Sequence, residues 1–135
     1  MKLIEKEQFQ DCRRRIYDKI IDIFDKTLTH GYKKAVLGCF YIDRSPVPSL
    51  RLYYIIDNSN EYTNFIFGSP ASGEVIYDLT DLCEDLQYTM RKHGSRWTAF
   101  TFVRERVGRF RAKFGYEMIN NVNHMFLVEW RSKYF

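Results

Sequence analysis

The stretch Arg109-Phe-Arg-Ala-Lys-Phe-Gly-Tyr116 alternates basic and apolar residues almost without interruption. Because successive side chains of a strand point to opposite faces, this period of two predicts a strand over residues 109–116. Its apolar positions are expected to face a core and its basic positions to face solvent. The aromatic stretch 96–104 precedes it, and the turn between them, 106–108, ends in a glycine that tolerates positive φ. We therefore expect a hairpin near the C-terminus.

Outside this hairpin, the sequence pattern predicts three more strands, at 33–43, 49–57 and 61–67, and two helices, at 5–28 and 78–92. The connections between the three strands are short and rich in turn formers, which predicts antiparallel neighbours in a meander. Strands grouped in runs, with helices between the runs, indicate the α+β class. The expected architecture is an antiparallel sheet, made of a three-strand meander plus the C-terminal hairpin, with both helices packed against it.

Apolar stripes at helical spacing define the inner faces of the two helices. The stripe of the second helix comprises Leu79, Leu82, Cys83, Leu86 and Met90. That of the first comprises Phe9, Cys12, Ile16, Ile20 and Ile23. Asp78 or Thr80 is expected to cap the second helix. The tail 125–135 fits either a last strand or a short helix.

The composition describes one ordinary globular domain spanning residues 1–135. Apolar residues make up 45% and charged residues 28%, and the net charge is +4. The three cysteines, Cys12, Cys39 and Cys83, are odd in number and match no zinc spacing, so we expect buried thiols in a reducing compartment. With no secretion signal and no apolar run of about 18 residues, we expect a soluble, cytoplasmic protein.

The sequence contains no spacing typical of catalysis. There is no phosphate-binding glycine loop, zinc-protease motif or nucleophile elbow. His30, His93 and His124 lie far apart in expected loops and are interpreted as surface residues. We therefore expect no enzymatic activity, no cofactor, no metal and no small-molecule substrate.

An acidic surface on the second helix is the leading candidate binding site. Residues 74–86 carry five acids and no Lys or Arg. The predicted partner-binding residues are Asp78, Asp81, Glu84, Asp85 and, beside them, Tyr88. The alternative interpretation is a helix N-terminus enriched in acids, which the helix macrodipole favours. That alternative accounts for Asp78 and Asp81 better than for the other acids.

A basic surface on the C-terminal hairpin is the alternative binding site. Its residues are Arg104, Arg106, Arg109, Arg111 and Lys113. They could bind phosphate or an acidic protein, or they could protect a solvated sheet face from aggregation. An RNA-binding sheet usually mixes exposed aromatic residues with basic ones on the same face. Here the two kinds alternate, which weakens the nucleic-acid interpretation.

A family resemblance comes from the last third of the chain. Its motifs are Trp97-Thr-Ala-Phe-Thr-Phe102, then Gly108-x-Phe110-x-x-x-Phe114-x-Tyr116-Glu117, and finally Trp130-x-x-Lys133-Tyr134. In order and spacing these resemble the YezG-like family of bacterial immunity proteins. The resemblance implies a small α+β protein that binds and neutralises a cognate toxin domain, often a nuclease, of a polymorphic or contact-dependent system. It implies no cofactor and no catalytic residue.

Three functional hypotheses follow. The first is an immunity protein, or antitoxin, that binds its toxin domain in the cytoplasm. The second is an RNA- or DNA-binding module that uses the basic hairpin 104–113. The third is a structural subunit of a larger assembly.

Overall fold

The computed structural model describes residues 2–28, 31–57, 59–65, 74–105 and 108–135, with the side chains of the first helix described from Phe9 onward. The elements are α1 (Lys2–Thr27), β1 (Tyr32–Phe40), β2 (Ser49–Ile56), β3 (Tyr62–Asn64), α2 (Val75–Lys92), β4 (Ala99–Glu105), β5 (Arg109–Gly115) and α3 (His124–Ser132). Among the described residues, no helix combines the length and apolarity needed to cross a membrane.

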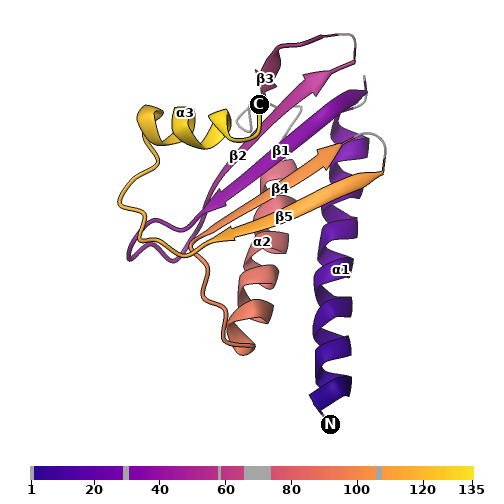
Figure 1. Cartoon of the computed structure of the whole chain (residues 1–135), viewed down its shortest axis with the longest axis vertical. Helices are drawn as coiled ribbons and strands as arrows, with labels where there is room; N and C mark the ends of the chain where they lie inside the picture. The colour runs from indigo at the N-terminus through magenta and orange to yellow at the C-terminus, as the bar shows by residue number, and fades with distance from the viewer. Residues whose placement is uncertain (1, 29–30, 58, 66–73, 106–107) are drawn as a thin grey trace.

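The α+β class and the antiparallel sheet predicted from the sequence are confirmed. The five strands lie in the order β3-β2-β1-β4-β5, and every neighbouring pair is antiparallel. Figure 1 shows α1 and α2 on one face of this sheet and α3 on the other. The last residues of the third predicted strand, 66–67, lie outside the described residues.

Helices α1 and α2 cover one face of the sheet with a large apolar core. From α1 this core takes Ile16, Tyr17, Ile20 and Phe24, with Leu28 just after the helix, and from α2 the whole predicted stripe. Cys12, predicted to be buried, is exposed, whereas Cys39 and Cys83 are buried as expected. The predicted stripe of α1 is therefore wrong at Cys12, because the buried face of this long helix turns toward Tyr17 and Phe24 instead.

Helix α3 settles the ambiguous tail and covers the opposite face of the sheet. It begins after Asn123, whose side-chain oxygen accepts a hydrogen bond from the backbone N–H of Phe126 at 2.9 Å. Phe126 and Trp130 are four residues apart, so they share one side of the helix, and they contact the sheet together with Tyr134, which follows the end of the helix. Together with Val36 and other strand residues, they form a second apolar cluster.

Trp130 fixes α3 to the centre of the sheet. Its indole Nε1 donates a buried hydrogen bond to the hydroxyl of Thr101 at 2.9 Å. Its ring lies edge-on to Phe40, with the ring centroids 5.2 Å apart. Below it lies Gly38, where an added Cβ would be 2.6 Å from the Cζ2 atom of Trp130. The missing side chain at Gly38 is what lets the indole approach the strand.

The C-terminal hairpin has the predicted alternation, but its apolar side is only partly covered. Phe114 is half-buried against Phe100 and Trp97, and Ala112 packs on the same core. Phe110 remains 40% exposed, because β5 is the last strand of the sheet and has a neighbour on one side only. Tyr116, predicted to face the core, is exposed because β5 ends at Gly115.

Trp97 is buried, but on the other side of the sheet from the one its alternation predicts. A period of two would place Trp97 on the same face as Val103, whereas it packs beside Phe100 in the α1–α2 core. Strand β4 begins only at Ala99, so Trp97 precedes the regular pleat and does not follow its period of two.

We predict that Gly38→Ala lowers the free energy of unfolding by about 1–3 kcal/mol, because the new methyl group overpacks against Trp130 and Phe40. Denaturant titration followed by circular dichroism measures the change. Gly115→Ala is the matched control, since a Cβ there would meet only the Cβ of Ala99 at 3.4 Å. Equal midpoints for Gly38→Ala and the wild type would show that Trp130 does not rest on this strand.

Candidate functional site

The acidic surface lies on the outward side of α2. Asp78, Asp81, Glu84, Asp85 and Tyr88 are all exposed, as the sequence predicted. At about 100° per residue, they lie within about 60° of Asp81 around the helix axis. The buried stripe of α2 occupies the opposite side and fixes the helix against β1 and α1. The five predicted residues therefore form one continuous, solvent-facing surface.

Two more exposed residues, Glu74 and Tyr77, extend the acidic surface toward the start of the helix. Tyr77 is 70% exposed and Tyr88 is 61% exposed, so two tyrosine rings lie among the acids. The ring of Tyr88 is positioned by Lys92, whose ammonium group lies 4.7 Å from the ring centroid. Sequence reasoning missed Tyr77, although its spacing of four from Asp81 places it on the same side. Aromatic residues of this kind are enriched in protein interfaces.

The carboxylates of this surface have no basic partner in the described part of the chain. The ion pair found among those residues joins Arg44 and Asp43, at 4.0 Å, and lies elsewhere. Asp81 stands three residues after Asp78 and four before Asp85, so like charges are neighbours along the helix. The carboxylates of this surface are therefore not neutralised by direct ion pairs.

The start of α2 weakens the alternative explanation of these acids. The helix begins at Val75, three residues before the predicted start, with Glu74 as its N-cap and no side-chain capping hydrogen bond. The expected capping role of Asp78 or Thr80 is therefore wrong. Because the macrodipole acts within the first turn, it favours Glu74 and Asp78 but not Asp81, Glu84 or Asp85.

The basic surface of the hairpin is divided between the two faces of the sheet. Arg109, Arg111 and Lys113 are exposed and share one face, opposite Glu105, Val103 and Thr101 of β4. We call these three residues the basic row. Arg104 pairs with Phe110 on the other face, so its predicted membership of the same surface is wrong, because it falls at the opposite parity of the strand. Arg106 lies outside the described residues.

Lys34 of β1 adds to the charge beside the basic row. Burial lowers the pKa of its ammonium group, the negative charge of Glu105 opposes that shift, and the positive charge of Arg111 adds to it. Lys34 also donates a hydrogen bond to the backbone carbonyl of Tyr134. The basic row and the acidic surface lie on opposite faces of the sheet, so one flat interface can contact one of them but not both.

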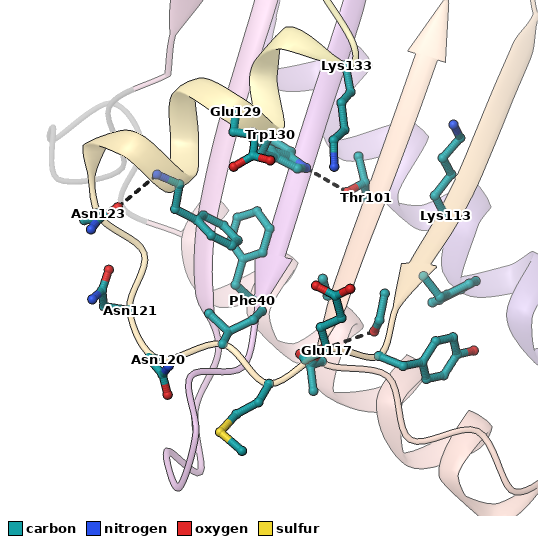
Figure 2. A pocket seen from close by; sticks show the side chains of 18 of the residues that line it. Phe40, Thr101, Lys113, Glu117, Asn120, Asn121, Asn123, Glu129, Trp130 and Lys133 are labelled. Atoms are coloured by element: carbon teal, nitrogen blue, oxygen red, sulfur yellow. Dashed lines mark hydrogen bonds between the residues drawn. The ribbon is translucent and has the colours of Figure 1, made fainter.

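A groove of about 950 Å³ lies between α3 and the ends of β4 and β5. Figure 2 shows Trp130 inside it, hydrogen-bonded to Thr101, with Lys113 on the strand side and Lys133 on the helix side. Glu117 and Glu129 also line the groove, so its charged groups balance. Its other polar lining consists of asparagine amides and of threonine and tyrosine hydroxyl groups, contributed by Asn120, Asn121, Asn123, Thr98, Thr101, Tyr116 and Tyr134.

The side chains with reactive chemistry are buried or dispersed. Burial, together with the hydrogen bond that the Cys39 thiol makes to Cys83, raises the pKa of the Cys39 thiol well above its ordinary value, so this thiol is protonated at neutral pH. His93 is exposed and stacks on Phe9 with ring centroids 4.1 Å apart, and His124 is exposed at the first position of α3 rather than in a loop. His30 lies outside the described residues. Across the described ranges, no three metal-binding side chains come together.

Comparison with known proteins adds no family assignment: the chain matches no protein-family model and no curated protein.

Repulsion within the acidic surface should be measurable as a loss of stability. We predict that Asp81→Asn raises the free energy of unfolding by a few tenths of a kcal/mol, because a like-charge pair at this spacing costs about 0.2–0.5 kcal/mol. Asn and Asp have similar helix propensities, so the change isolates charge. Thermal melts at low and high salt measure the effect, which should shrink with salt.

Asp18→Asn in α1 is the matched control, since Asp18 is also exposed on a helix but has Arg14 four residues before it. Removing its charge should not stabilise the protein. Equal gains from Asp18→Asn and Asp81→Asn would mean that the acids of α2 are not under special electrostatic strain.

Proposed function

We propose that this chain is an immunity protein that binds and neutralises a cognate toxin domain, of the nuclease kind, in the cytoplasm. In this proposal the framework is a three-strand meander extended by a C-terminal hairpin, with both long helices on one face. Its task is to hold the acidic surface of α2 rigid. The observation that carries the proposal is this exposed, unpaired cluster of carboxylates with Tyr77 and Tyr88 among them.

The physical argument concerns charge complementarity. A nuclease needs a positive surface to hold nucleic acid, and an acidic helix can compete for that surface. Opposite charge accelerates association by steering the two proteins together. The exposed tyrosines supply the large apolar contact that charge alone lacks. The resemblance of the C-terminal motifs to YezG-like immunity proteins supports the same proposal.

Charge reversal tests which surface binds the cognate toxin domain, which we expect to be encoded beside this gene. Asp81→Lys combined with Asp85→Lys should slow association by about tenfold or more at low salt, because steering is lost. The defect should diminish as salt is added. Stopped-flow fluorescence or surface plasmon resonance measures the rate.

Arg109→Glu combined with Arg111→Glu is the companion variant, since it alters the same number of exposed charges on the opposite face of the sheet. It should leave toxin binding nearly unchanged. If the basic variant loses binding and the acidic variant keeps it, the toxin contacts the hairpin instead.

A nucleic-acid-binding module using the basic hairpin is the second candidate, favoured by the shared orientation of the basic row. In this alternative, RNA or DNA would bind the purified protein directly, with a salt dependence that reports the phosphate contacts. The exposed aromatic ring of this hairpin, Phe110, lies on the other face, where it cannot stack on bases held by the basic row.

We also propose that the protein has no hydrolytic activity of its own. Purified protein is expected to leave RNA, DNA and simple esters intact, because burial holds the Cys39 thiol protonated and the exposed histidines stand apart. Turnover that copurifies with the protein and disappears when His93 or His124 is replaced by Ala would contradict this.

A further inference from the structure

Strand β5 presents an open edge of the sheet. It is the last strand in the order, and within the described residues no strand pairs with its outer side. It runs for seven residues, longer than β3 at the opposite edge, which has three. An edge strand leaves alternate backbone N–H and C=O groups unpaired, and an added strand can bind them.

One face of this edge is positively charged. Arg109, Arg111 and Lys113 project from it side by side, and Lys34 lies close to Arg111 on the same face. Glu105, opposite Arg109 on β4, is the acid that the strand pairing places beside them. A second strand lying alongside β5 would bring its own side chains within reach of this row.

The other face of the edge carries the apolar side chains of β5, which are incompletely covered, with Arg104 of β4 on the same face. Phe110 contacts Tyr17 and Phe102, with ring centroids 5.5 and 5.4 Å away, yet stays 40% exposed. Beside it, a groove of about 320 Å³ separates β5 from α1. Its lining residues are Gln10, Arg13, Arg14, Tyr17 and Phe110. Apolar side chains of an added strand would enter this groove and cover the exposed part of Phe110.

We propose that β5 binds an extended segment of a partner protein as a sixth strand, and that this segment alternates acidic and apolar residues. Its acidic side chains pair with the basic row, while its apolar side chains fill the groove against α1. The pattern follows from β5 itself, which carries charge on one face and apolar residues on the other.

The positive charge of β5 also argues against two other binding partners at this edge, a second copy of the chain and a nucleic acid. A second copy pairing through β5 would set one basic row against another, and like charges directly opposite are unfavourable. A nucleic acid would find few rings to stack on beside the basic row: Phe110 lies on the other face and Tyr134, next to Lys113, is buried, which leaves Phe135 next to Lys34 as the exposed ring. The same charges that prevent self-association therefore favour an acidic strand. This inference concerns a surface separate from the one proposed to bind the toxin and does not rest on that proposal.

A model peptide tests the proposal without knowledge of the natural partner. The probe is a blocked, fluorescently labelled peptide in which glutamate and valine alternate over the seven-residue length of β5. Fluorescence anisotropy at low salt should show saturable binding, and a peptide alternating lysine and valine should not bind. Arg111→Glu combined with Lys113→Glu should weaken binding of the glutamate peptide by about tenfold or more.

Two controls separate strand addition from simple charge attraction. Because the amides of alternate residues point to opposite sides of a strand, methylating the backbone nitrogens of one residue type should abolish binding and methylating the other should spare it. Lys19→Glu combined with Lys26→Glu changes the net charge equally, at exposed positions of α1, and should leave binding nearly intact. Circular dichroism melts confirm that all variants fold.

Several results would overturn the proposal. These are failure of the glutamate peptide to bind, equal loss with both methylated peptides, or an equal effect of the α1 variant. Preferential binding of single-stranded RNA by the basic row would assign the edge to nucleic acid. Concentration-dependent dimerisation that Arg111→Glu strengthens would assign it to a second copy.

Discussion

The fold depends on β1 being packed on both of its faces. Ala35, Leu37 and Cys39 face the α1–α2 core, while Val36 and Phe40 face α3. A strand buried on both sides consists of a nearly continuous apolar run, and that is what this segment contains. Strands β2 and β4 pair with β1 along its two sides, and the helices on both faces of the sheet pack against these strands. Strand β1 therefore fixes the positions of the elements that carry the acidic surface of α2 and the basic row of β5.

The sequence was most informative where periodicity is strong and least informative at the ends of elements. The stripe of α2 and the alternation of β5 are long enough to identify by period alone, and they placed both candidate surfaces. The tail was ambiguous because the spacing from Phe126 to Trp130 covers little more than one turn, so its helical character depends on the Asn123 cap and on contact with the sheet. Arg104 lies on the other face from the basic row because neighbouring residues of a strand alternate between its two faces, even when they are clustered in the sequence. Trp97 departs from this alternation because it precedes the regular pleat of β4.

The two charged surfaces differ in how they are supported. The acids lie on a helix whose other side is fully buried, so their positions are fixed by the core rather than by partners of their own. The basic row lies on β5, an edge strand that pairs with β4 on one side and has no neighbouring strand among the described residues on the other side. Neither surface is neutralised by the other, because the sheet separates them. The protein therefore has a net charge of +4, although the outward side of α2 is negatively charged.

The central claim is that the outward side of α2 is a protein-binding surface. Hydrogen–deuterium exchange or amide chemical-shift mapping of the protein, free and mixed with the toxin domain that the proposed function expects beside its gene, tests that claim most directly. The account predicts that changes concentrate on α2, around Tyr77, Asp81 and Tyr88, while β5 and α3 are unaffected. A footprint confined to β5, or the absence of any stable complex with that domain, would contradict it.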